Sequence, residues 1–348
     1  MKILVMTPTN KQLLPIVDSV IKVLKNLGEK YEIDTLPLNI FYLNCSYFQR
    51  KLYKLGYKAA ENKYEKNIVA ELQEKCNQFQ PDFILVLNGT NVSVPVQKFL
   101  SNYKTILWLW DSYKRDNLLS SFVNLATEIF CFEYEDIEFL AQKNIFAHYL
   151  PLGADSEIYC PRECKRDIDI SFVGTASKER IALLDKVCER ALQENWTVKI
   201  GGPFYDTKHF WKKYLFKYRR AHLEKFLANR LFLPSELAEL YNRSKICLNI
   251  NTTIHHSLSP RTFEICATKS FQLMNSGQNS NGLMNLETDL ATFDGADDLL
   301  EKVKFFLEND ELREKIALAG YNSVMKNCTL KKSVEKLLAE SEIVRGFY

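Results

Sequence analysis

Short apolar runs alternate with longer stretches of helical periodicity along the first 150 residues. Lys2–Met6, Asp82–Leu87 and Thr105–Trp110 are apolar runs typical of strands buried on both faces of a parallel sheet. Lys11–Leu27 has apolar residues at a helical period, and Arg50–Phe79 is a long, charged helical stretch. Further strands are predicted at Tyr31–Leu36, Glu128–Phe132 and Phe146–Leu150. This alternation predicts a βαβ series on a parallel sheet.

A second α/β series begins after a polar segment. We interpret residues 151–167 as a linker, because they combine prolines with mixed charges. Strands are predicted at Asp169–Val173, Trp196–Ile200, Lys245–Asn251 and Ser270–Met274, with helices at Lys178–Gln193, Ser235–Asn242 and Pro260–Thr268. From Ala296 onward the chain is predicted to be helical, with breaks near Asn309, Gly320 and Cys328. We therefore expect α/β domains at 1–150 and 168–328 and a C-terminal helix at 329–348, with ligands bound beyond the strands' carboxyl ends.

Composition and charge narrow the functional classes. The 348 residues are 46% hydrophobic and 26% charged, which is typical of a globular protein. A net charge of +3 excludes binding of nucleic acid or anionic lipid by bulk charge. Residues 208–230 are the exception, with eight basic residues, one acidic residue and interleaved aromatics. This segment predicts a membrane-surface helix, a nucleic-acid face, or an amphipathic helix that covers the second sheet with a solvated basic face.

The nine cysteines do not form a recognisable disulfide or zinc pattern. Their number is odd, and no C-x-x-C occurs. Most lie in apolar runs, so we predict reduced, buried thiols in a cytoplasmic protein. No apolar window approaches the ~20 residues that span a bilayer, and the N-terminus lacks a signal-peptide pattern.

The segment 249–275 carries the most informative candidate site. A predicted strand ends in a polar loop, and Ser259-Pro260 then begins a helix with a favoured cap. Arg261 and Glu264 are three residues apart, so they share one side of its first turns. A helix N-terminus suits a diphosphate, Arg261 could pair with phosphate, and Glu264 could accept two ribose hydroxyls. The pattern fits equally well a capped helix with an Arg–Glu surface pair.

Two other strand ends carry candidate residues. Gly174-Thr175 follows a strand and precedes a helix, so its backbone could approach a phosphate closely. Asp111 follows the strand Thr105–Trp110 and could be either a general base or a helix cap. No G-x-G-x-x-G, P-loop or G-x-S-x-G motif supports a dinucleotide site, an NTP site or a hydrolase.

Several pieces occur in an order that resembles the GT-B glycosyltransferases of the spore-maturation-protein type, within the "glycosyl transferases group 1" clan. They cover about 150–335: Leu150–Asp155 (LPLGAD), Ile170–Thr175 (ISFVGT) with Arg180, Ser244–Ile250 (SKICLNI), Arg261–Glu264 (RTFE), and Leu299-Leu300 through Arg313 to Ala319-Gly320. The N-terminal half matches the family only in its α/β pattern.

This resemblance implies two Rossmann-like domains whose parallel sheets face each other across a cleft. It implies transfer of a sugar from a nucleotide diphosphate sugar to a hydroxyl of a glycan, lipid-linked or protein acceptor, without a bound metal, other cofactor or nucleic-acid partner. The acceptor side would be the N-terminal domain, and 208–230 could contact the inner face of a membrane. The resemblance implies that Glu264 binds the ribose and Arg261 the diphosphate, with Gly174, Thr175 and Arg180 on the phosphate side. It implies that His255 or His256 contacts the transferred sugar. Asp111 would act as the catalytic base.

One departure from the clan keeps other functions open. Retaining members carry Glu-x7-Glu, whose second Glu corresponds to Glu264, but His256 stands eight residues earlier. Two alternatives to a glycosyltransferase therefore stay open. One is a nucleotide-sugar epimerase on the same fold, and the other is a non-catalytic glycosyltransferase-like binding partner.

Overall fold

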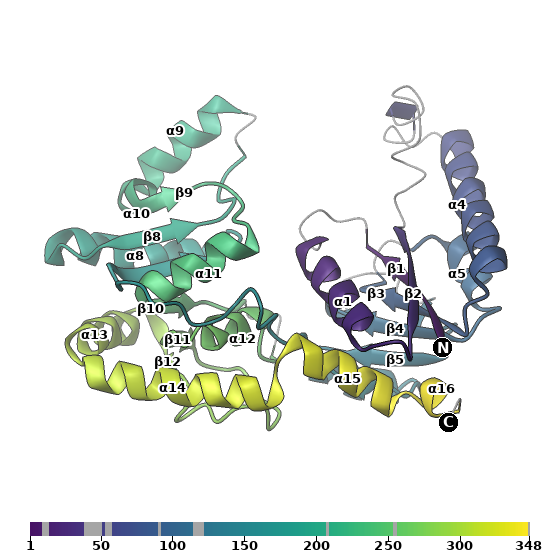
Figure 1. Cartoon of the computed structure of the whole chain (residues 1–348). Coiled ribbons are helices and arrows are strands. Elements are labelled where there is room, and N and C mark those ends of the chain that lie inside the picture. Colours follow the sequence, from purple (N-terminus) through teal and green to yellow (C-terminus); the bar gives the residue numbers. More distant parts are fainter. Residues whose placement is uncertain are drawn as a thin grey trace. The chain divides into compact units, whose positions relative to one another are not determined.

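Two sheets of six strands organise the chain (Figure 1). The structure is a computed structural model that describes residues 1–8, 14–37, 51–52, 58–89, 92–113, 122–206, 209–252 and 256–346. Unit 1 comprises Met1–Leu152 and Leu330–Tyr348, and unit 2 comprises Gly153–Thr329. All described strand pairings in both sheets are parallel. This is the α/β class that the alternating pattern predicts.

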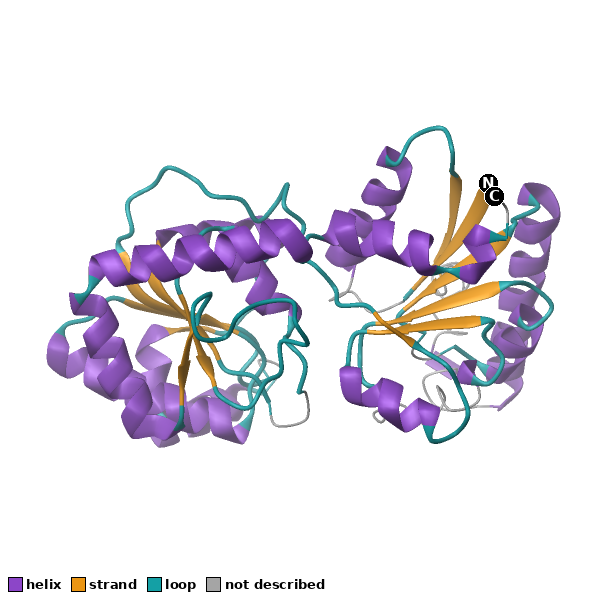
Figure 2. Ribbon diagram, turned by 90° about the horizontal axis from the view of Figure 1, so that it is seen from below, coloured by secondary structure: helices purple, strands orange, loops and turns teal. Residues whose placement is uncertain are grey.

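Unit 1 has the strand order β2-β1-β3-β4-β5-β6. Its strands are β1 (Lys2–Thr7), β2 (Glu32–Pro37), β3 (Phe83–Leu87), β4 (Thr105–Leu109), β5 (Glu128–Cys131) and β6 (His148–Tyr149). Its helices are α1 (Leu14–Asn26), α4 (Lys58–Phe79), α5 (Val94–Leu100), α7 (Tyr134–Ala141), α15 (Leu330–Glu340) and α16 (Glu342–Arg345). Alternate residues of β1 enter different cores, with Leu4 facing α4 and α5, and Ile3 facing α1 and α15. Helices therefore cover both faces of the sheet (Figure 2).

The last two helices complete the core of unit 1. Leu330, Val334 and Leu337 of α15 are buried in the cluster that contains α1. The backbone N–H of Ile343 donates to Glu128 Oε1 at 2.6 Å, which ties α16 to the first residue of β5. Removal of the C-terminal segment would therefore expose one face of the first sheet.

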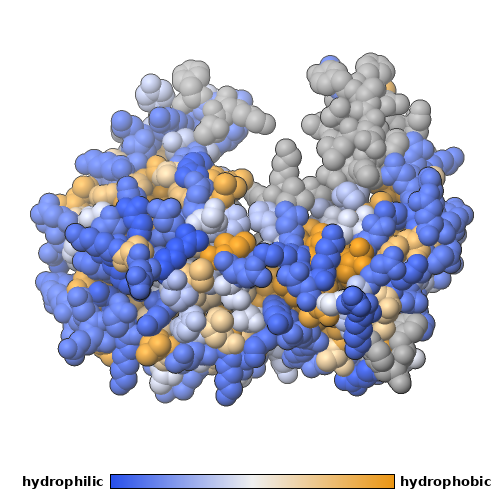
Figure 3. All heavy atoms as spheres, viewed as in Figure 1, coloured by the Kyte–Doolittle hydropathy of each residue, from blue (hydrophilic) through white to orange (hydrophobic). Residues whose placement is uncertain are grey.

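Unit 2 has the strand order β12-β11-β10-β7-β8-β9. Its strands are β7 (Ile168–Val173), β8 (Val198–Gly201), β9 (Leu227–Ala228), β10 (Ser244–Asn249), β11 (Gln272–Asn275) and β12 (Ala291–Phe293). Its helices are α8 (Lys178–Glu194), α9 (Phe210–Arg219), α10 (Ala221–Phe226), α11 (Pro234–Arg243), α12 (Pro260–Ala267), α13 (Gly295–Glu308) and α14 (Asp310–Asn327). Within the predicted linker, Tyr159 is buried in the core of this unit. Hydrophilic residues cover most of the surface visible in Figure 3.

Two predictions about local structure are wrong. The expected break near Gly320 is absent, because α14 continues from Asp310 to Asn327. A Cβ on Gly320 would lie 2.3 Å from the carbonyl oxygen of Asp289, so this glycine permits close packing of α14. The basic segment 208–230 is predicted to be one helix, but it contains two helices, α9 and α10, and the edge strand β9.

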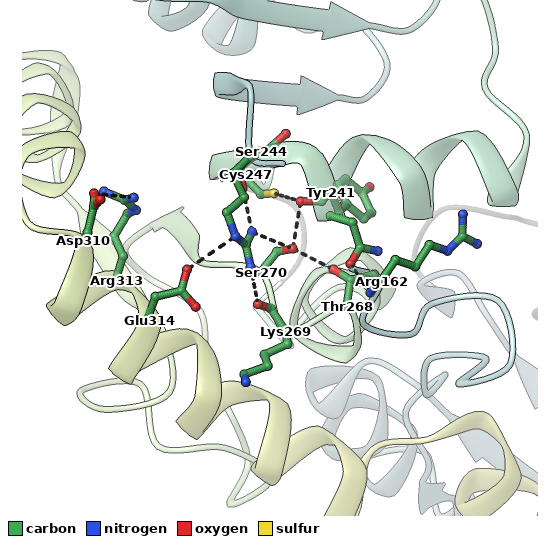
Figure 4. Close-up of polar contacts among 12 residues, drawn as sticks. Arg162, Tyr241, Ser244, Cys247, Thr268, Lys269, Ser270, Asp310, Arg313 and Glu314 are labelled. Carbon is green, nitrogen blue, oxygen red and sulfur yellow. Dashed lines mark hydrogen bonds and ion pairs between the residues drawn. The ribbon is translucent and has the colours of Figure 1, made fainter. Parts of the chain in front are cut away.

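A polar network lies at the amino ends of β10 and β11 (Figure 4). Arg166 donates to the carbonyl oxygens of Ser244 at 2.8 Å and Lys269 at 2.9 Å. Its Nε lies 3.4 Å from Oε1 of Glu314 on α14. Because parallel strands direct their ligand sites to the opposite, carboxyl edge, we assign this network to stability.

Replacement of Arg166 by Met is expected to destabilise unit 2 by about 2–3 kcal/mol, because two carbonyls would lose a charged donor. Denaturant unfolding measures the change. Arg162→Met is the matched control, since the Arg162 side chain is exposed and its backbone N–H makes the described contact with Asn242. Equal loss of stability in the two variants would contradict the assignment.

Candidate functional site

The second sheet reverses its strand order between β7 and β10. After β7 the chain adds β8 on one side, whereas β10 pairs on the other side of β7. Helices therefore leave the carboxyl ends of these two neighbouring strands in different directions. Such a switch point leaves a crevice at the carboxyl edge of an open parallel sheet, where ligands bind.

Arg180 joins the two strand ends at this switch point. Its Nη1 donates to the carbonyl oxygen of Thr175 at 2.9 Å and to Thr175 Oγ1 at 3.2 Å, beyond the end of β7. Its Nε donates to the carbonyl oxygen of Ile250 at 2.7 Å, beyond the end of β10. Ser177 Oγ accepts from the Arg180 backbone N–H at 3.1 Å and caps α8. The capped first turn of α8 thus fixes this guanidinium at the sheet edge.

Glycines bring the loops after β7 and β8 into backbone contact. The N–H of Gly174 donates to the carbonyl oxygen of Gly201 at 3.0 Å. A Cβ on Gly202, whose φ is +133°, would lie 1.9 Å from the carbonyl oxygen of Gly174. The Gly201-Gly202 pair therefore has a packing role beside Gly174, beyond the turn that its sequence indicates.

The first turns of α12 place Arg261 and Glu264 in a polar cluster with two buried tyrosines. Arg261 Nη1 donates to Tyr241 Oη at 2.9 Å. Glu264 shares a side-chain hydrogen bond with Tyr159. Burial raises the pKa of Glu264, and the nearby Arg261 guanidinium offsets part of that rise. Tyr159 and Tyr241 are absent from the sequence-based site, because they come from separate segments and belong to no motif.

The two site arginines lie close enough to repel each other. Burial lowers the pKa of Arg180 to about 10, and the positive charge of Arg261 adds to this effect. Arg180 comes from α8 and Arg261 from α12, so the fold brings together two cations separated by 81 positions in the sequence. An anion bound beside both would relieve their repulsion.

Two buried polar atoms near these arginines have no hydrogen-bond partner in the part of the chain that the structure describes. They are Asn251 Nδ2, just beyond β10, and Ser259 Oγ, just before α12. Asn251 is 8% exposed. Because a buried donor without a partner is costly, both atoms are suited to a bound polar ligand.

The predicted sugar-side histidines are only partly covered by the structure. His255 lies outside the described residues. His256 is exposed, and its carbonyl oxygen accepts from the N–H of Asn279 at 2.6 Å. The backbone of the loop is thereby tied to the residues that follow β11.

Asp111 lies in unit 1, just beyond β4. It is half-buried, and its Oδ1 accepts from the backbone N–H of Ser112 at 2.9 Å. The buried carboxylate at this turn is Asp136, which accepts from Ser112 Oγ at 3.0 Å and from the N–H of Tyr113 at 2.7 Å. Asp136 therefore has the main structural role in this turn.

The described residues contain neither a metal-binding cluster nor a membrane-spanning helix. No group of three or more His, Cys, Asp or Glu side chains in them could hold a metal ion. No described helix is long and apolar enough to cross a membrane.

Comparisons with known proteins support the family resemblance. Residues 180–339 match the family model described as "Glycosyl transferase-like". The match spans less than half of the chain, and the chain as a whole has the GT-B fold. It is also similar to the spore protein CgeB of Bacillus subtilis (strain 168), with 23% identity over 292 residues that cover 78% of this chain and 86% of CgeB.

Solved structures share the fold over almost the whole chain. Anabaena Alr3699/HepE in complex with UDP-glucose has a TM-score of 0.68 and 13% identity, covering 98% of this chain and 100% of that one. UDP-GlcNAc 2-epimerase from Neisseria meningitidis bound to UDP-GlcNAc has a TM-score of 0.60 and 12% identity, covering 97% and 99%. At these identities the likeness establishes the architecture alone.

Proposed function

We propose that the protein transfers a sugar from a nucleotide diphosphate sugar to an acceptor hydroxyl. The observation that carries this proposal is the pair of guanidinium groups, Arg180 and Arg261, at the switch point of the second sheet. Two adjacent cations beside a helix N-terminus form a suitable site for a diphosphate. The presence of UDP-glucose in the HepE complex makes a uridine nucleotide the first donor to test.

The other donor-side residues have distinct proposed roles. Glu264 accepts hydrogen bonds from the ribose hydroxyls, exchanging its contact with Tyr159 for a contact with the ligand. Gly174 and Thr175 border the phosphates, since the absence of a side chain at Gly174 lets the backbone come close. The unpartnered Asn251 amide and Ser259 hydroxyl donate to the same ligand.

The proposed chemistry assigns roles to a carboxylate, a histidine and the two arginines. Asp111 removes the proton of the acceptor hydroxyl as general base, and His256 or His255 contacts the transferred sugar. The departing diphosphate is stabilised by Arg180, Arg261 and the positive end of the α12 dipole, so a metal-independent reaction is proposed. The acceptor is a glycan, a lipid-linked molecule or a protein.

Two observations favour other functions on the same fold. The structural likeness to UDP-GlcNAc 2-epimerase favours an enzyme that acts on the donor alone. The histidine at position 256, in place of an acidic residue, favours a non-catalytic binding partner. Nucleotide release from a panel of nucleotide sugars, with and without cell extract, separates them. A transferase requires acceptor, an epimerase isomerises the donor without acceptor, and a binding partner does neither.

A cytoplasmic location is proposed from the thiols. Eight described cysteines are free, and six of them are buried. Such usage is typical of a reducing compartment.

Replacement of Glu264 by Ala is expected to weaken UDP binding by about 1–3 kcal/mol, because hydrogen bonds to the ribose would be lost. Isothermal titration calorimetry measures the change. Glu301→Ala, at an exposed position of α13, is the control and should leave affinity unchanged. Unchanged affinity in Glu264→Ala would remove this residue from the donor site.

A further inference from the structure

Helix α9 exposes a stripe of large side chains on its solvent side. Trp211, Tyr214, Leu215 and Tyr218 are 52%, 69%, 40% and 87% exposed. Their spacing of three, one and three residues places them on one face of the helix. We call these four residues the α9 stripe. An amphipathic helix normally buries such a face, whereas the described residues of unit 2 leave this one exposed apart from His209 and Lys212 beside the Trp211 ring.

The opposite side of α9 is already occupied. Phe216 packs inward against Tyr205, with ring centroids 5.1 Å apart, and against Phe204 at 6.3 Å. After α9, Arg220 Nη1 binds Asp185 Oδ2 of α8 at 3.3 Å. Figure 1 shows α9 beside α10, extending away from the other helices of the unit. The helix is therefore anchored by contacts that do not involve the α9 stripe.

Lys217 and Arg219 flank the stripe, one on each side around the helix. Lys213, Lys217 and Arg219 are exposed, and none has a described acidic partner. Lys212 differs, because its Nζ lies 3.1 Å from Asp206 Oδ2. The helix itself contains no acidic residue. Its solvent side thus combines an apolar stripe with an uncompensated positive charge.

We propose that α9 is a membrane-contact helix that binds the surface of an anionic lipid bilayer through the α9 stripe and its flanking cations. Trp and Tyr combine a ring that favours the interface with a polar group that stays hydrated, and Leu215 adds purely apolar area. Lys217 and Arg219 meet the negative headgroups. The helix lies in the plane of the interface, as expected for an amphipathic segment.

The same residues fit a lipid surface better than nucleic acid. Single-stranded nucleic acid binds in positively charged grooves with stacking platforms. Here Tyr218, with 87% exposure, stands on a projecting helix. Such a convex surface matches a flat, deformable interface. The inference is independent of the proposed sugar transfer, since it requires neither the donor site nor Asp111.

Flotation with lipid vesicles tests the proposal on the full chain. Vesicles of phosphatidylcholine with 30% phosphatidylglycerol are expected to bind the protein, whereas pure phosphatidylcholine vesicles should bind it at least about 10-fold more weakly. The triple variant Trp211→Ser, Tyr214→Ser, Tyr218→Ser should lose at least about 10-fold in partitioning. The charge variant Lys217→Gln, Arg219→Gln should lose a similar factor, and salt should weaken the wild type in the same way.

Matched control variants distinguish specific contact through α9 from attraction of the vesicles by the overall positive charge of the protein. Lys304→Gln, Lys315→Gln, Lys326→Gln removes three exposed cations from α13 and α14 and should leave vesicle binding unchanged. Brominated lipid should quench the emission of Trp211, and Trp211→Phe should remove most of that quenching, because Trp108 and Trp110 are buried and Trp196 is half-buried and lies outside α9. Melting temperatures should stay close to that of the wild type in all variants.

Three outcomes overturn the proposal. They are absence of binding to the anionic vesicles, equal binding by the stripe variant and the wild type, and binding to single-stranded DNA that competes fully with vesicles. Loss of vesicle binding by the stripe variant with unchanged UDP affinity supports the membrane contact. This result is independent of whether the proposed sugar transfer is observed.

Discussion

Replacing Asp111 by Asn is expected to lower turnover by about 10²–10⁴-fold while UDP affinity stays unchanged. Asn cannot accept the proton of an acceptor hydroxyl, but it preserves the shape of the turn and the hydrogen bond from the Ser112 N–H. The loss should appear in kcat and kcat/KM together, because the carboxylate is needed only when the proton moves. Initial rates with saturating donor measure it.

The contrasting role of Asp136 supplies the control. Asp136 is 1% exposed and binds Ser112 and Tyr113. Asp136→Asn should therefore lower the melting temperature of unit 1, whereas Asp111→Asn should lower it little. Full activity in Asp111→Asn, with or without a small loss of stability, would assign Asp111 a capping role and leave the reaction without its proposed base.

The second large effect is expected at the arginine pair. Arg180→Gln and Arg261→Gln should each weaken UDP binding about 10–100-fold, because each removes a charge-assisted hydrogen bond to the diphosphate. The double variant should lose less than the product of the two factors, since removing one cation also removes repulsion from its neighbour. Uridine itself, which lacks the diphosphate, should bind the wild type and the variants alike.

A control variant on the same helix distinguishes direct binding of the diphosphate from a general effect of positive charge on UDP affinity. Arg190 of α8 pairs with Glu194 at 2.8 Å, away from the strand ends. Arg190→Gln should keep wild-type UDP affinity. An equal loss of UDP affinity in all three variants would indicate an effect of long-range charge. The diphosphate would then not lie between Arg180 and Arg261.

Continuous apolar runs made much of the fold predictable. Phe83–Leu87 and Thr105–Leu109 are entirely buried, as expected for central strands of a parallel sheet. The edge strands β9 and β12 have two and three residues, too few to produce a periodic signal. The break predicted near Gly320 is wrong, because a glycine within a helix can either break the helix or permit close packing, and only the neighbouring Asp289 carbonyl decides between them.

The sequence predicts the residues of the candidate site only where they belong to a recognisable motif. Arg261 and Glu264 stand three apart after a recognisable cap, so their shared side of α12 follows from helical geometry. The proximity of Arg180 to Arg261 and the tyrosine partners arise from tertiary packing across the switch point. No sequence pattern indicates Asn251, because its importance rests on a buried side-chain amide that has no hydrogen-bond partner among the described residues.

The central claim is that a nucleoside diphosphate binds at the switch point of the second sheet. Hydrogen–deuterium exchange of the full chain with UDP, GDP, ADP or dTDP tests it most directly. We expect at least one of them to protect three segments together, namely 174–180, 250–252 and 256–264. Absence of protection with all four, or protection confined to unit 1, would contradict the account.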